Sequence, residues 1–350
     1  MGDHHHLRNL GYQLPICMEC LAGKPECPWE DVSTTPRWES TISLVNPWNA
    51  NAPSPLLGIP SQTFRPERRF RKDPFHIFKQ TLGGHFVASS VVLFLDLGYF
   101  ERPGLPNNVD AQLEYAHEDF HHFVKKEWSG KTVANLKSFT KGIFHWQKVK
   151  TFPFARLKGS DTMLCIRWLF QLLQHGCVPL GGSERPRKSL MTQPLAPWHV
   201  PFLERMQRAC RCSLEFFHLL HSNGVWLSPE VARQMAQCAQ TFCGDYSALA
   251  KLCHSRGLRR YHLEPTLHYF HHYGIDMIRH LRQHGEVPQL SPGVDNCEAD
   301  EDFVGRQARL SRQCHATTTT TRTIERYLIK TYFVHSNQDW GSAAHSGLKR

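Results

Sequence analysis

Apolar residues recur at spacings of three and four along most of the chain after Asp73, and this spacing constrains the fold more than any other feature. In the segment 109–128, Leu113, Ala116 and Phe120 would share one face of a helix. Alternation of apolar and polar residues is too weak to build a β-sheet. We therefore expect a mainly α fold. A helix that begins at Asp73 is expected to be interrupted at Gly83 and Gly84, and a second one to run on to about residue 99. Further helices are expected over residues 109–128, 163–174, 202–222, 229–254, 265–284, 300–313 and 323–334.

The first 72 residues differ from the rest because they are irregular, contain cysteines and are rich in proline. Four prolines between Asn46 and Gln62 disfavour both helices and central strands there. Trp29, Trp38 and Trp48 are expected to anchor this segment onto the helices. The expected organisation is an irregular, zinc-knuckle-like segment over 1–72, a helical domain over 73–335 and a flexible tail over 336–350.

A C-x-x-C motif at Cys17 and Cys20 is the first candidate for chemistry. Two thiolates separated by two residues can turn back on one ion, which makes half of a tetrahedral zinc site. Cys27 is the candidate third ligand, and the fourth is expected among His4, His5, His6 and His76. The alternative is a pair of reduced thiols on a loop. A redox role is disfavoured because no βαβ pattern surrounds the pair.

His117, Glu118 and His121 match H-E-x-x-H, in which two histidines on one side of a helix bind zinc and the glutamate activates a water. The sequence offers no obvious third ligand downstream. Both histidines flank the apolar stripe of their helix, so we favour a packing role for them. A zinc-dependent hydrolase built on these three residues is the alternative.

A second group of histidines lies between residues 262 and 280. Spacings of three and four can place His268 with His271 or His272 on one helical face, where neutral imidazoles bind metals. We favour the other interpretation, a helix that interleaves aromatic and histidine side chains at a half-buried interface. The histidines concerned are His262, His268, His271, His272 and His280.

The chain is basic, since 41 Lys and Arg against 31 Asp and Glu give a net charge of +10. This sign of charge favours acidic partners, with nucleic acid first among them. The charge is divided among several clusters rather than concentrated in one. The residues expected to contact phosphate are Arg65, Arg68, Arg69, Arg71, Lys72, Arg256, Arg259 and Arg260.

Neither a secretory signal nor a membrane span is expected. The first 16 residues lack an apolar run, and the most apolar stretch, 86–100, is too short and contains Asp96. We therefore expect an intracellular protein, nuclear or cytoplasmic, that has no membrane partner and is not secreted. Its 12 cysteines are then thiols or metal ligands rather than disulfides.

Several enzyme motifs are missing from the sequence. No G-x-S-x-G elbow marks an activated serine, and no P-loop or G-x-G-x-x-G motif supports nucleotide binding by those routes. Asp73 is expected to cap a helix that Pro74 opens, with His76 as a partner of the carboxylate or as a ligand.

Short motifs follow one another in a distinctive order. A Gly-Asp pair at Asp3 precedes the C-x-x-C motif, D-x-x-H opens a helix at Asp73, and a late segment from Glu264 carries several histidines. This order resembles that of large eukaryotic DNA transposases of the CACTA/Plavaka kind. It is also similar to a group of multicopy, transposon-derived proteins of dinoflagellate algae, in which the segment Asp300–Arg312 is typical.

The resemblance implies an interrupted RNase-H-like catalytic domain in which three acidic residues bind two metal ions. Asp3 matches the family's Gly-Asp carboxylate, and Asp161 is the counterpart of its late glutamate. The family's first catalytic aspartate would lie upstream of Met1, and Thr266 stands where the family has a lysine. The resemblance therefore implies a transposase-like protein whose catalysis is lost, with Asp3 and Asp161 as the candidate catalytic residues.

We interpret the sequence as a transposon-derived, catalytically inactive helical protein. Zinc would staple it at Cys17, Cys20 and Cys27, and its basic clusters would contact DNA. The first alternative is the zinc-dependent hydrolase, with Glu118 as the catalytic residue. The second is a helical interaction module with no ligand.

Overall fold

The computed structural model describes residues 16–44, 71–102, 104–127, 136–147, 150–174 and 198–336. It confirms a mainly helical fold that follows an irregular N-terminal segment. The chain forms two compact units, Met1–Asn296 and Cys297–Arg350. The helical domain expected over 73–335 is therefore divided after residue 296, and most of the expected tail lies outside the described residues.

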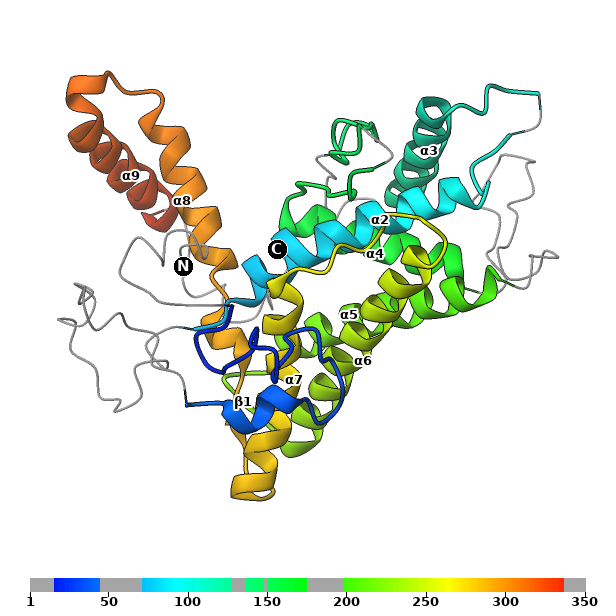
Figure 1. The fold of residues 1–350 in the computed structure, drawn as a ribbon. Helices are drawn as coiled ribbons and strands as arrows, with labels where there is room; N and C mark the ends of the chain where they lie inside the picture. The colour runs from blue at the N-terminus through cyan, green and yellow to red at the C-terminus, as the bar shows by residue number, and fades with distance from the viewer. Residues whose placement is uncertain are drawn as a thin grey trace. The chain divides into compact units, whose positions relative to one another are not determined.

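Helices make up most of the first unit, and successive helices pack on one another (Figure 1). Helix α5 packs against α4 and α6, and α6 packs against α7. The elements of this unit are the 3₁₀-helix η1 (Arg37–Thr41), the π-helix η4 (Phe75–Leu82), α2 (Gly83–Asp96), α3 (Val109–Glu127), α4 (Gly159–Leu173), α5 (Val200–Ser222), β1 (Trp226–Leu227), α6 (Pro229–His254), α7 (Pro265–His284), β2 (Gln289–Leu290) and the 3₁₀-helix η5 (Pro292–Asp295).

An aromatic cluster forms the middle of the hydrophobic core. Phe78 of η4, Phe242 of α6 and Phe270 of α7 are fully buried. Their ring centroids lie 4.8 to 5.5 Å apart. Replacing a buried phenylalanine by alanine typically costs about 3–5 kcal/mol of stability. This cluster therefore holds α7 firmly against η4 and α6.

The first long helix begins where the sequence predicts it. The Asp73 carboxylate accepts hydrogen bonds from the backbone N–H groups of Phe75 and His76, at 3.0 and 3.4 Å. It also contacts Nδ1 of His76 at 2.5 Å. His76 is thus a partner of the capping carboxylate.

A two-residue antiparallel pair, β1 with β2, joins the start of α6 to the segment that follows α7. The second unit consists of α8 (Glu298–Ser311), the short 3₁₀-helix η6 (Ala316–Thr318) and α9 (Thr319–Ser336). Phe303 of α8 and Tyr327 of α9 meet edge to face, with centroids 5.5 Å apart. Among the described helices, none is both long and apolar enough to cross a bilayer.

Candidate metal centre

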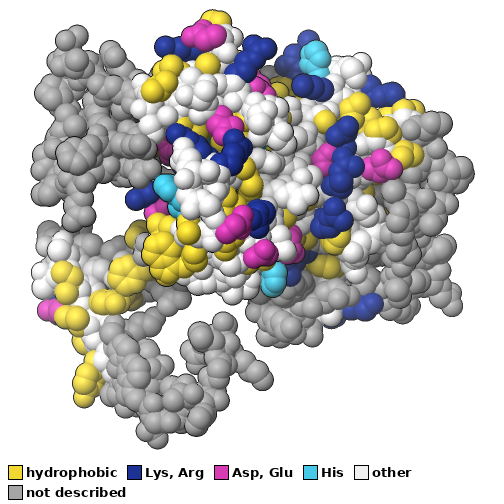
Figure 2. Space-filling model, turned by 90° about the horizontal axis from the view of Figure 1, so that it is seen from below, with side chains coloured by type: hydrophobic (Ala, Val, Ile, Leu, Met, Phe, Trp, Pro, Cys, Tyr) yellow, Lys and Arg dark blue, Asp and Glu magenta, His cyan; other side chains and the backbone are white. Residues whose placement is uncertain are grey.

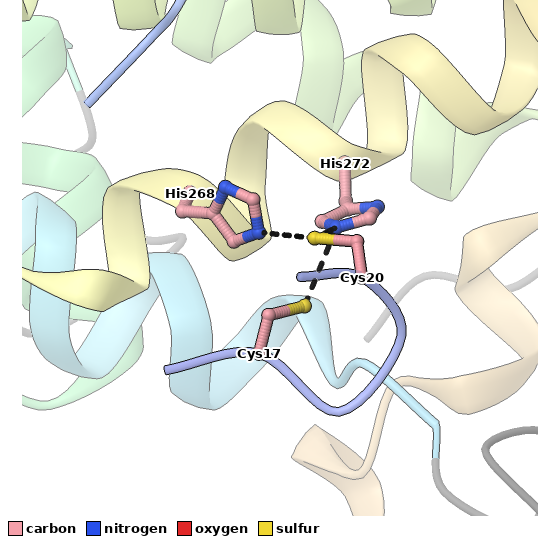
Figure 3. Close-up of side chains that lie close together, drawn as sticks. All are labelled: Cys17, Cys20, His268 and His272. Atoms are coloured by element: carbon pink, nitrogen blue, oxygen red, sulfur yellow. Dashed lines mark hydrogen bonds between the residues drawn. The ribbon is translucent and has the colours of Figure 1, made fainter. Parts of the chain in front are cut away.

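Four ligand-type side chains from distant parts of the chain converge beside α7 (Figure 3). Cys17 and Cys20 come from the N-terminal segment, and His268 and His272 come from α7. Sγ of Cys17 lies 3.4 Å from Nε2 of His272. Sγ of Cys20 lies 3.3 Å from Nε2 of His268 and 3.5 Å from Nε2 of His272.

Local structure explains why each pair points to one spot. The C-x-x-C stretch turns back on itself, and the backbone N–H of Glu19 donates to Sγ of Cys17 at 3.4 Å. His268 and His272 are four residues apart, so they lie one above the other on the same face of α7. Each pair is therefore arranged by its own segment, and packing only has to bring the two segments together.

The spacing of the four ligand atoms suits a tetrahedral zinc ion. Zn–S bonds of about 2.3 Å and Zn–N bonds of about 2.0–2.1 Å place sulfur and nitrogen about 3.6 Å apart in such a site. The three sulfur–nitrogen distances here are 3.3 to 3.5 Å. All four residues are completely buried. A donor set of two thiolates and two imidazoles is one of the usual structural zinc sets.

A charged network surrounds the outer side of His272. Nδ1 of His272 faces Asp276 at 3.6 Å and Glu19 at 3.8 Å. Nζ of Lys72 bridges these two carboxylates, at 2.7 Å from Glu19 and 2.8 Å from Asp276. Carboxylates behind a metal-binding histidine orient its ring and make the nitrogen that faces the metal a better ligand.

Electrostatics in this cluster favours the thiolate that a metal needs at Cys17, and without an ion it keeps the facing His272 protonated, so a bound metal would take the place of that proton. Burial alone would raise the pKa of the Cys17 thiol, but the hydrogen bond with Cys20 and the charges of His272 and His268 hold that pKa well below its usual value. Burial opposes the protonation of His272, but the nearby Cys17 and Asp276 raise its pKa to about 10. Cys17 is thus a thiolate that attracts positive charge.

Trp38 closes the site on another side. Its indole is fully buried, and its ring centroid lies 4.5 Å from that of His268 and 4.4 Å from that of His272. Its Nε1–H donates to the backbone oxygen of Asp31 at 3.0 Å. The predicted anchoring role of this tryptophan thus includes covering the cluster and excluding water from it.

The structure places Cys27 outside the four converging side chains. Cys27 is buried, but its backbone serves a tight turn: its N–H donates to Lys24, and its carbonyl accepts from Gly23, both at 2.9 Å. The prediction of Cys27 as the third ligand is therefore wrong. His268 and His272 complete the group that Cys17 and Cys20 begin. Of the predicted fourth ligands, His76 pairs with Asp73. His4, His5 and His6 lie outside the described residues.

The interpretation of the α7 histidines as half-buried packing residues is wrong for His268 and His272, which are fully buried and face the thiols. His271 is also fully buried, but it packs beside Trp38, with centroids 5.4 Å apart, and faces neither thiol, so its role is packing. The spacing of four residues was the available signal. This spacing shows that His268 and His272 lie on one face of the helix, but it does not show which segment of the chain packs on that face.

The H-E-x-x-H residues on α3 have other contacts. Nε2 of His117 lies 3.2 Å from the carbonyl oxygen of Leu136. Glu118 pairs with Arg102 at 2.8 Å, and His121 is exposed. Within the described part of the chain, no third metal ligand joins His117 and His121. His117 packs against Phe139, with ring centroids 5.3 Å apart, as a packing role predicts, whereas His121 is exposed.

The transposase-like acidic residues do not form a described site. Asp161 is buried in the first turn of α4 and belongs to no group of three ligands among the described residues. Asp3 lies outside those residues.

The basic residues predicted to contact phosphate divide into three groups. The prediction is wrong for Lys72 and Arg260. Lys72 bridges Glu19 and Asp276. Arg260 is buried and pairs with Asp96 at 2.9 Å. The exposed members are Arg71, Arg256 and Arg259. Arg65, Arg68 and Arg69 lie outside the described residues. On the face drawn in Figure 2, basic side chains are interspersed with acidic ones and do not gather into one area.

Comparison of the chain with protein-family models, with curated proteins and with solved structures finds no match. The resemblance to CACTA/Plavaka transposases therefore stays a prediction drawn from motif order.

Proposed function

We propose that this protein binds one zinc ion through Cys17, Cys20, His268 and His272, and that the ion fastens the N-terminal segment to α7. The observation that carries the proposal is the convergence of two cysteines and two histidines, all fully buried, with their ligand atoms at tetrahedral spacing. The protein supplies all four ligands, so no position stays open for a substrate or a water. A closed site of this kind has a structural role.

The distance along the sequence makes the ion important for the fold. Cys20 and His268 are 248 residues apart, and the buried apolar side chains of the N-terminal segment form only a small cluster, which Tyr269 and Ile275 of α7 complete. An ion that is bound by both segments adds its binding free energy to folding. The chain is accordingly proposed to be a helical scaffold that zinc completes.

Metal analysis tests this proposal with Cys17→Ser and a matched control, Cys27→Ser. Both cysteines are buried in the same segment, but only Cys17 faces the histidines. We expect Cys17→Ser to weaken zinc binding by more than roughly 100-fold, the upper range for the loss of a residue that only supports a ligand. We also expect it to remove the thiolate-to-metal absorption band of the Co²⁺-substituted protein. Cys27→Ser should retain both.

Zinc binding that survives Cys17→Ser would contradict the proposal. Equal loss in both cysteine variants would contradict it too, because that result would restore Cys27 as a ligand.

We also propose that the protein binds nucleic acid through its exposed arginines. The net charge of +10 and the exposure of Arg71, Arg256 and Arg259 support this. The transposon-derived lineage agrees with such a role and rests on motif order.

A further inference from the structure

A second group of metal-ligand side chains lies away from the zinc cluster, where the connection between α6 and α7 passes the start of α2. Its members are His85 of α2, His262 of the connection and Glu264 just before α7. Nε2 of His85 lies 3.2 Å from Oε1 of Glu264, and Nδ1 of His262 lies 2.9 Å from the same oxygen. The three ligand atoms all lie within 4.8 Å of one another.

The other nitrogen of His85 indicates which ring nitrogen carries a hydrogen. Nδ1 of His85 lies 3.3 Å from the backbone oxygen of Pro153. A carbonyl oxygen only accepts hydrogen bonds, so Nδ1 carries the hydrogen. If the imidazole is neutral, Nε2 carries no hydrogen, and its lone pair faces the Glu264 carboxylate oxygen, which repels it. A proton or a metal ion between the two atoms removes this repulsion, and a histidine that donates Nδ1–H to a backbone carbonyl is a typical metal ligand.

Several contacts hold the connection rigidly against α2. The backbone N–H of Tyr261 donates to the Ser89 hydroxyl at 2.8 Å, and the Tyr261 hydroxyl lies 3.2 Å from that of Ser90. Next to it, the backbone oxygen of His262 accepts a hydrogen bond from the Tyr246 hydroxyl at 2.8 Å. The position of His262 opposite His85 is thus set by the core, as a preorganised site requires.

One side of this group is open to solvent. His85 is buried, whereas the side chains of His262 and Glu264 are 40 % and 30 % exposed. The ring of Phe152 stacks on His262, with centroids 4.5 Å apart, and covers only one face of it. An ion here would have three protein ligands and room for water, unlike the closed zinc cluster.

We propose that His85, His262 and Glu264 form a second metal site, which takes a divalent first-row transition ion such as Zn²⁺ and leaves a coordination position to water. Two imidazoles and one carboxylate suit this class of ion, whereas Mg²⁺ and Ca²⁺ prefer oxygen ligands. The site shares no residue with the zinc cluster and stands independently of it.

Titration of the full-length, metal-free, reduced protein with Co²⁺ tests the proposal. The total bound metal is measured after gel filtration, and the thiolate absorption band reports the cysteine-containing cluster alone. We expect two tightly bound equivalents in the unmodified chain, of which only one produces the band. His262→Ala and Glu264→Gln should each reduce the total to one and keep the band. His254→Ala, an exposed histidine at the end of α6, should keep both equivalents.

Cys17→Ser separates this proposal from the zinc scaffold, because it should abolish the band and leave the second equivalent bound. A single equivalent that produces the band in the unmodified chain would overturn the second site and leave His85 and Glu264 as an ion pair only, whereas a single equivalent without the band would contradict the zinc scaffold instead. Two equivalents in both His262→Ala and Glu264→Gln, or one in His254→Ala, would overturn it as well. If His262→Ala alters the circular dichroism spectrum, its fold has changed and its metal content is not informative. The metal content of Glu264→Gln then decides between the outcomes, since this variant keeps the size of the side chain.

Discussion

Individual histidines of α7 have different roles although they are adjacent in the chain. His272 faces the thiolate of Cys17, and the pKa of His272 is raised to about 10. His271 is buried, and neither of its ring nitrogens has a hydrogen-bond partner in the described part of the protein. Burial, together with the positive charges of His272 and His268, lowers the pKa of His271 to about 3. In the metal-free protein, one turn of helix thus holds a charged and a neutral imidazole.

The neutral state of His271 predicts a loss of stability in acid. In the unfolded chain this side chain titrates near its ordinary pKa of about 6.5. Between pH 6.5 and 3 the unfolded state therefore holds a proton that the folded state does not, and stability falls as the pH falls. At pH 5 this amounts to about 2 kcal/mol relative to pH 7.5.

His271→Phe, which keeps an aromatic ring beside Trp38 and cannot bind a proton, should remove this part of the pH dependence. Urea unfolding of both proteins at pH 5 and pH 7.5, with zinc present, measures the difference. Stability curves that run parallel in pH would show that His271 does not titrate on unfolding.

The junction of η4 and α2 shows how an element depends on its neighbours. Gly83 and Gly84 suggest an interruption of the helix, yet the backbone stays helical there, with φ −64° at Gly83. The glycines are needed for close packing instead. A Cβ atom on Gly84 would lie 2.4 Å from the backbone oxygen of Ala155 and 3.0 Å from the ring of Phe154. The helix therefore continues through these glycines, and Gly84 leaves the room that the segment at Phe154 and Ala155 needs to pack directly on it.

This packing predicts opposite effects for two glycine-to-alanine substitutions. Gly84→Ala should destabilise the protein by about 1–3 kcal/mol, because the backbone of Ala155 must move. Gly244→Ala, in the interior of α6 with nothing within 4 Å of the new atom, should stabilise it by up to about 1 kcal/mol through helix propensity. Chemical denaturation of the two variants measures both effects. Equal stability of the two variants would contradict the close contact at Gly84.

At the scale of the whole molecule, the chain has a net charge of +10. Some of its basic side chains are buried in ion pairs, and others are exposed to solvent. Arg260 is buried and pairs with Asp96. Arg256 lies on the surface with its guanidinium 4.0 Å from the ring centre of Trp198, and Arg259, three residues later in the chain, is also exposed. The exposed arginines face solvent and can approach phosphates, although Nη1 of Arg259 also donates to the backbone oxygen of Lys150 at 2.7 Å.

DNA affinity measured against salt concentration should reflect this division. We expect the unmodified protein to bind a DNA duplex with a negative slope of log affinity against log salt. The double variant Arg256→Ala/Arg259→Ala should reduce the slope by up to about 2, since each lost phosphate contact contributes about 0.9. Arg260→Gln should leave the slope unchanged in the folded protein. A flat plot for the unmodified chain would refute nucleic-acid binding.

Local patterns in the sequence determined the helical class, the bounds of most helices, the Asp73 cap and the pairing of Cys17 with Cys20. These features depend on residues within a few positions of one another, and their physical causes, periodic burial and side-chain capping, act at that range. The pair His268 and His272 was visible in the same way, as one face of a helix. Each of the two ligand pairs of the metal centre can therefore be recognised from residues that lie close together in the sequence.

Only the tertiary structure decided that these two pairs meet, that Cys27 does not join them, and that Lys72 and Arg260 are bound in ion pairs. Cys20 and His268 are 248 residues apart, and the contact between them depends on how η4, α6 and α7 pack around Phe78, Phe242 and Phe270. Such packing is a property of many side chains acting together over the whole core. No short-range spacing in the sequence encodes it.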